Sequence, residues 1–96
     1  MAAFMVVNVY MREANWVADY VAAVPDIIRK YGGEYLAVSG PLQKFEGEGA
    51  TPDRTVIFSF PTLAAIDEFM KCEEYRPWKE KRLAESSADI IGFETV

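Results

Sequence analysis

The sequence contains no histidine, and Cys72 is its only cysteine. Without histidine the chain cannot form a Ser-His-Asp or Cys-His triad or a histidine-ligated metal or haem site, and it lacks the usual proton shuttle near neutral pH. A single cysteine excludes an internal disulfide and a cysteine-rich zinc site, and a free thiol is typical of a reducing compartment. These absences remove most histidine- and cysteine-based chemistry.

Positive charge is also scarce, because ten Lys and Arg residues stand against 15 Asp and Glu residues, for a net charge of -5. Such a chain lacks the basic surface that nucleic-acid backbones require, so we expect no nucleic-acid partner. No apolar run approaches the roughly 20 residues of a membrane span, and the apolar segment 1–11 is too short for a signal peptide. We therefore expect no membrane association and a cytoplasmic location.

The 96 residues, 51% of them hydrophobic, are enough for one domain, 1–96. Hydrophobic periodicity predicts strands at 4–11, 34–40, 54–60 and 89–96, helices at 15–31 and 63–72, and a further short helix within 73–83. Asn15 and Thr62 are the expected N-caps, Pro25 is expected to kink or divide the first helix, and Gly32 to end it. This order predicts an α+β fold, a ferredoxin-like βαββαβ sandwich whose four-stranded antiparallel sheet carries its helices on one face.

The other face of such a sheet, here called the open face, should be polar in a monomer. Period-two alternation instead places apolar and aromatic side chains on it. The expected open-face residues are Phe4, Val6, Asn8, Tyr10, Tyr35, Ala37, Ser39, Thr55, Ile57, Ser59, Ile90, Gly92 and Glu94. This patch is larger than soluble monomers usually expose, and a second copy related by a two-fold axis is the commonest cover. We therefore expect a homodimer.

The open face also carries hydrogen-bonding side chains among its apolar groups, as small-molecule pockets do. We expect Asn8, Tyr10, Tyr35, Ser39 and Ser59 to be the polar groups of a pocket on this face. Asn8 is expected in a central strand, where a buried amide must find a partner or costs ~1–3 kcal/mol. These groups either contact a small organic ligand or pair with one another and with water at the dimer interface.

Two further groups are candidates for the edge of the pocket. Glu46 and Arg54 flank the turn before the third strand, as an ion pair at the rim or as a solvated hairpin pair. Tyr75, Trp78 and Arg82 have spacings of three and four, which bring them to one side of a short helix. There they either cover the pocket or seal the edge of the core. Any catalysis is expected to use Asn8, the tyrosines and Arg54, but no residue is assigned a specific catalytic role, and we expect no metal or other cofactor.

The sequence resembles a known family over nearly its whole length, in the runs 19–47 and 54–86. The landmarks are Pro25, Gly32-Gly33, Glu46-Gly47, Phe60-Pro61, Glu74-Tyr75 and Arg82. Together they are similar to the small bacterial family called domain of unknown function 1330. The resemblance implies a ferredoxin-like fold assembled as a dimeric α+β barrel, and it implies no established reaction. Where family members often have an arginine, this chain has Val38, so an anionic ligand shared with them is not implied.

The sequence thus favours a homodimer that binds a small, mostly apolar organic molecule in a pocket on the sheet face. The superfamily implied by the resemblance includes cofactor-free oxygenases, so any chemistry is expected to be cofactor-free acid/base or oxygenation chemistry. The alternative is a non-catalytic structural or interaction module whose sheet face only forms the dimer. An enclosed cavity would favour the binding protein, and mutually paired polar side chains without a void would favour the module.

Overall fold

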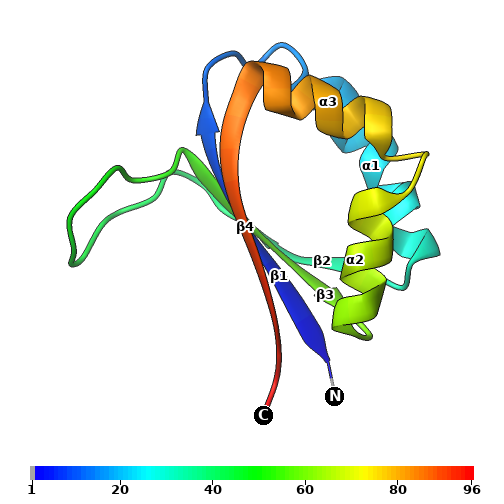
Figure 1. Cartoon of the computed structure of the whole chain (residues 1–96). Helices are drawn as coiled ribbons and strands as arrows, with labels where there is room; N and C mark the ends of the chain where they lie inside the picture. Colours follow the sequence, from blue (N-terminus) through cyan, green and yellow to red (C-terminus); the bar gives the residue numbers. More distant parts are fainter. Residues whose placement is uncertain (1) are drawn as a thin grey trace.

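The computed structural model describes residues 2–96 and contains one antiparallel sheet with three helices on one face (Figure 1). The strands are β1 (Ala3–Met11), β2 (Glu34–Val38), β3 (Arg54–Phe60) and β4 (Ser86–Glu94), in the order β2-β3-β1-β4. The helices are α1 (Val17–Lys30), α2 (Leu63–Lys71) and α3 (Arg76–Glu85). The predicted ferredoxin-like sandwich is confirmed. None of the helices within residues 2–96 combines the length and apolarity needed to cross a membrane.

The first helix begins and continues differently from its prediction. Trp16, and not Asn15, occupies the N-cap position, and its indole N–H donates a hydrogen bond of 2.6 Å to the Glu13 carbonyl. α1 runs through Pro25 as one helix. It ends as expected at Gly32, whose φ of 82° is a left-handed conformation that favours glycine.

In the second half of the chain, β3 is followed by two helices, α2 and α3, before β4 completes the sheet. The Thr62 side chain caps α2 as predicted, accepting a hydrogen bond of 3.1 Å from the Ala65 N–H. β4 begins at Ser86, directly after α3, and therefore three residues earlier than expected. The Arg12 guanidinium, which follows β1, donates to the carbonyls of Leu83, Ala84 and Ser86 and thus fixes the junction of α3 and β4.

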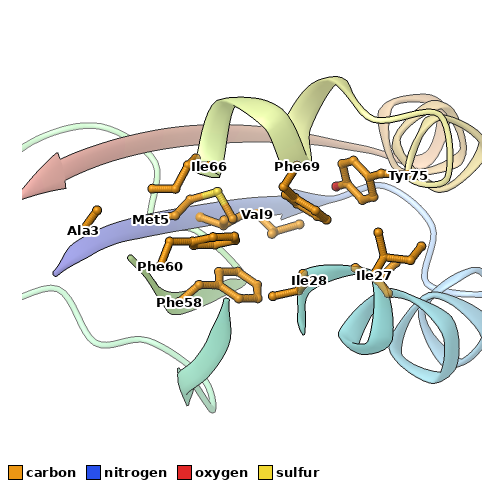
Figure 2. Packing of buried hydrophobic residues seen from close by; sticks show 12 residues of the cluster. Ala3, Met5, Val9, Ile27, Ile28, Phe58, Phe60, Ile66, Phe69 and Tyr75 are labelled. Carbon is orange, nitrogen blue, oxygen red and sulfur yellow. The ribbon is translucent and has the colours of Figure 1, made fainter. Parts of the chain in front are cut away.

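The core lies between the helices and the face of the sheet that they cover, here called the covered face. Figure 2 shows Phe58 and Phe60 of β3 lying between Ile28 of α1 and Phe69 of α2. Phe69 also packs on Tyr75, with ring centroids 4.4 Å apart. Burying aromatic side chains of this size supplies most of the stability that such a small domain can gain.

The strand register confirms the predicted faces of β1 and β3. The pairs Phe4–Ser59, Val6–Ile57 and Asn8–Thr55 lie directly opposite one another on the open face. Met5 and Val7 alternate with these residues and are buried under the helices. The open face expected from β1 and β3 is therefore correct.

The prediction for β4 is wrong by one residue. Opposite Tyr10, Asn8, Val6 and Phe4 lie Ser87, Asp89, Ile91 and Phe93. Ile90, Gly92 and Glu94 therefore belong to the covered face. The physical reason is α2, which packs over Gly92: a Cβ there would lie 3.4 Å from the Leu63 side chain and 3.5 Å from that of Ile66.

The prediction for Tyr35 is also wrong, because β2 contains a bulge between Tyr35 and Ala37. A bulge inserts one extra residue and so reverses the alternation of the side chains beyond it. Tyr35 lies opposite Phe58 on the covered face, and their ring centroids are 4.5 Å apart. Ala37 and Ser39 lie on the open face, as expected. Residues 39–53 then leave the sheet as a long arm that extends away from the helices (Figure 1).

Candidate functional site in a cavity under the helices

A cavity of about 410 Å³ lies between the covered face of the sheet and the helices. Its floor consists mainly of apolar side chains on the covered face of β1 and β3, among them Met5, Val7 and Val56. Val17 and Tyr20 of α1 form one wall. The cavity is therefore on the opposite side of the sheet from the pocket that the sequence predicted.

Three arginines line this cavity, whereas none of the residues described as lining it is Asp or Glu. The whole chain carries only ten cationic residues against 15 acidic ones. Arg82 comes from α3, Arg29 from α1 and Arg54 from the start of β3. A mostly apolar cavity in an acidic protein thus has a positively charged lining, which attracts anions.

Arg82 is the buried member of this set, with 4% of its surface exposed. Its Nε lies 3.4 Å from the Tyr75 hydroxyl, to which it donates. Within residues 2–96 it takes part in none of the four ion pairs, and its Nη1 and Nη2 groups donate to no other described residue. A mostly buried charge without a countercharge is costly. The guanidinium nitrogens that have no partner among the described residues keep some accessible surface, so they can receive a partner from outside the protein.

Two tyrosines place their hydroxyls beside Arg82. The hydroxyl oxygens of Tyr20 and Tyr75 lie 2.6 Å apart and share a hydrogen bond. Burial, and then the neighbouring Tyr75, raise the pKa of the Tyr20 phenol above its ordinary value of 10.0. Burial likewise raises the pKa of Tyr35. Tyr20 and Tyr35 are therefore neutral hydrogen-bonding groups at physiological pH.

Exposed residues of the lining mark the opening of the cavity. Val21 of α1 and Val38 of β2 are both more than half exposed and both line the cavity. Arg29 and Arg54 are exposed as well, and Arg29 pairs with Asp26 on its own helix at 2.8 Å. A smaller depression of about 260 Å³, which includes Glu34, adjoins the cavity and shares Pro25, Ile28, Arg29 and Tyr35 with it.

The structure divides the predicted site residues between the two faces. Tyr35, Arg54, Tyr75 and Arg82 line the cavity. Asn8, Tyr10, Ser39 and Ser59 belong to the open face. Trp78 packs edge-on against Tyr20, with ring centroids 6.5 Å apart, outside the described cavity lining. The expected pair of Glu46 and Arg54 does not form among the described residues: Glu46 is exposed on the arm, and Arg54 donates to the Asp53 carbonyl.

On the open face, the side chains of Asn8 and Ser39 form hydrogen bonds with Thr55, whereas the hydroxyls of Tyr10 and Ser59 form none with another described residue. The Thr55 hydroxyl donates to the Asn8 side-chain oxygen at 2.7 Å. The Thr55 N–H donates to the Ser39 hydroxyl at 2.8 Å. These are the mutual pairs expected if this face serves assembly and not ligand binding.

Sequence reasoning missed Tyr20 and Arg29. Tyr20 belongs to the apolar stripe of α1, and the signal was its hydroxyl, since a buried phenol usually requires a polar partner. For Arg29 the sequence gives no signal beyond a favourable charge in the last turn of α1. Val38 of β2 also lines the cavity.

The family model for DUF1330, a domain of unknown function, matches residues 2–96. The chain belongs to the DUF1330 family. No curated protein matches it.

Solved structures with the same fold resemble this DUF1330 protein. A protein of unknown function from Rhodopseudomonas palustris is 19% identical, with a TM-score of 0.84 over 99% of this chain and 82% of that one. A dimeric ferredoxin-like protein of unknown function from Jannaschia sp. CCS1 is 13% identical, with a TM-score of 0.74 over 99% of this chain and 100% of that one. SnoaB, a cofactor-independent oxygenase from Streptomyces nogalater, is 10% identical, with a TM-score of 0.63 over 99% of this chain and 93% of that one. At these identities the likeness establishes the fold alone.

Proposed function

We propose that this DUF1330 protein is a homodimer that binds a small, mostly apolar organic molecule in the cavity between its sheet and its helices. The observation that carries the proposal is the cavity of about 410 Å³ with its apolar floor and few polar groups. Ligand pockets in proteins have this size and this composition. The same cavity argues against a purely structural module, because packed interiors leave few voids larger than a water molecule.

The open face supports the dimer. Ile91 and Phe93 are 62% and 48% exposed on it, beside Phe4 and Val6 of β1. An apolar patch of this kind needs a cover, and a second copy supplies one through a two-fold axis. Phe45 on the arm is 89% exposed and offers a further apolar contact to a second copy. The similar protein from Jannaschia is described as dimeric.

A neutral fluorescent probe tests the binding part of the proposal. N-phenyl-1-naphthylamine is apolar and uncharged, so its binding depends on the cavity and not on the arginines. The variant Val56→Phe adds bulk to the cavity floor, and Ile57→Phe adds bulk to the next residue, which faces the other side of the sheet.

We expect the probe to bind the wild-type protein and the Ile57→Phe variant alike, and to bind Val56→Phe at least tenfold more weakly. Absence of binding to the wild-type protein, or equal binding to both variants, contradicts the proposed site. Circular dichroism and urea unfolding establish that both variants are folded.

A second candidate function is cofactor-free chemistry on the bound molecule. It is favoured by the cluster of Arg82, Tyr75 and Tyr20, because a guanidinium and two hydroxyls can stabilise an anion that forms on a ligand. The Streptomyces neighbour is described as a cofactor-independent oxygenase. Oxygen uptake with ionisable polycyclic phenols tests this function. Uptake above the protein-free rate that is lost in Arg82→Gln supports it, and a rate equal to the protein-free control contradicts it.

A further inference from the structure

Among residues 2–96, no carboxylate forms an ion pair with the guanidinium of Arg82. The residue is 4% exposed, and its one side-chain hydrogen bond to a described residue, from Nε to the neutral Tyr75 hydroxyl, is long at 3.4 Å. An arginine keeps its charge across the physiological pH range, so it cannot escape the cost of burial by losing a proton. Arg82 also lines the cavity, so a ligand that enters there can reach its guanidinium.

Every other charged side chain that lines the cavity has the same sign. Arg29 from α1 and Arg54 from β3 add two positive charges, and the uncharged polar groups are the hydroxyls of Tyr20, Tyr35 and Tyr75. None of the lining residues within 2–96 is acidic. Among the described residues the cavity lining therefore contains no carboxylate, although the net charge of the chain is -5 and Asp26 pairs with Arg29 at the opening.

We infer that the ligand of this cavity is an organic carboxylate, whose carboxyl group pairs with Arg82 and Tyr75 and whose aromatic or aliphatic body lies over the apolar floor. The inference rests on the proposed binding function and specifies its substrate class. Nη1 and Nη2 of Arg82 form no hydrogen bond with another described residue, and a planar guanidinium matches a carboxylate with two parallel hydrogen bonds.

The distribution of the arginines fits a singly charged ligand. Only Arg82 is buried, whereas Arg29 and Arg54 are exposed at the opening. One buried cation balances one buried negative charge, and the floor beyond it is built from β1 and β3 residues such as Met5, Val7 and Phe58. The two exposed arginines increase the local concentration of anions at the entrance.

A pair of ligands that differ in charge and little in shape tests the inference: 2-naphthoate and its neutral amide, 2-naphthamide. The matched variants are Arg82→Gln and Arg76→Gln. Both arginines belong to α3, but Arg76 is exposed and paired with Glu73 at 2.8 Å, outside the described cavity lining. Arg82→Lys is a third variant, which keeps the positive charge but loses the planar guanidinium that can form two parallel hydrogen bonds to a carboxylate.

We expect the wild-type protein and Arg76→Gln to bind naphthoate at least tenfold more tightly than naphthamide in isothermal titration calorimetry. Arg82→Gln should lose this preference while binding naphthamide as the wild-type protein does, and Arg82→Lys should keep part of it. Thermal unfolding of each variant distinguishes a lost contact from a lost fold.

The outcomes separate the two proposals. If naphthamide and naphthoate bind the wild-type protein equally, or if Arg82→Gln keeps the preference, the carboxylate inference is overturned and the binding function stands. If neither molecule binds and the neutral naphthylamine probe also fails, both proposals are overturned.

Discussion

The hydroxyls of Tyr20 and Tyr75 meet inside the cavity at 2.6 Å and join α1 to the segment that leads into α3. Tyr75 is 2% exposed, and it accepts the N–H of Arg82 as well. The hydrogen bond between the two tyrosines therefore stabilises the helical layer and also belongs to the cavity lining beside Arg82. The following predictions depend on this cluster and on the two faces of the sheet.

Removing the Tyr20 hydroxyl should destabilise the protein modestly. In Tyr20→Phe the Tyr75 hydroxyl loses its closest partner, and a buried hydrogen bond contributes about 1 kcal/mol. We expect that decrease in the free energy of unfolding, measured by urea denaturation at pH 7. Tyr10→Phe is the control, because the Tyr10 hydroxyl forms no hydrogen bond with another residue of the described chain. Equal stability of the two variants would show that the contact contributes nothing.

Alkaline pH should narrow the stability difference between the wild-type protein and Tyr20→Phe. Burial raises the folded-state pKa of Tyr20 above 10.0, so above that pH the unfolded chain releases a proton that the folded chain keeps. The stability that the Tyr20 phenol contributes to the folded wild-type protein is fully present below pH 10. It decreases as the pH rises further, by up to about 1.4 kcal/mol per pH unit. Urea unfolding between pH 8 and pH 11 should show the two stabilities converging. A constant difference would contradict the burial of this phenol.

Replacing the buried arginine by an apolar residue should leave the ligand-free protein as stable as before or more stable. The Arg82→Met substitution removes an unpaired buried charge and retains a long, flexible side chain. We expect a free energy of unfolding unchanged or raised by about 1 kcal/mol. Arg12→Met, which loses three hydrogen bonds to carbonyls at the end of α3 and the start of β4, should instead lower it. A loss of more than about 2 kcal/mol in Arg82→Met would assign this residue a structural role.

A charge on the open face should dissociate the proposed dimer. Ile91→Lys places an ammonium group in the middle of the apolar patch formed with Val6 and Phe93, where a second copy would bury it. Sedimentation equilibrium at micromolar concentration should show a dimer for the wild-type protein and a monomer for the variant. Leu83→Lys, the same change at a 52% exposed site on α3, should remain dimeric. A monomeric wild-type protein, or a dimeric Ile91→Lys, would contradict the assignment of this face.

Local patterns predicted the fold well, because each element carries its own signal. The alternation of β1 placed Asn8 and Tyr10 on the open face, and Thr62 before the apolar stripe of α2 marked the start of that helix. The errors occur where a neighbouring element decides the outcome. The bulge after Tyr35 reverses one strand, and the packing of α2 over Gly92 determines the face of another.

The candidate site could be predicted only in part. The spacing of Tyr75, Trp78 and Arg82 is visible in the sequence, and the structure places the Arg82 Nε against the Tyr75 hydroxyl, whereas Trp78 lies outside the described cavity lining. Tyr20 lies 55 residues from Tyr75 along the chain, and no local pattern indicates that the two hydroxyls meet. The pocket was predicted on the open face because polar residues lie there, although the side-chain oxygen of Asn8 accepts a hydrogen bond from its cross-strand neighbour Thr55.

A crystal structure of the protein grown with 6-bromo-2-naphthoate would locate the ligand. We expect anomalous bromine density inside the cavity under the helices, with the carboxylate oxygens within hydrogen-bonding distance of Arg82 and Tyr75. Bromine density on the open face beside Asn8, Tyr10 and Ser59, or an empty cavity in a crystal grown at a saturating ligand concentration, would contradict the proposed site.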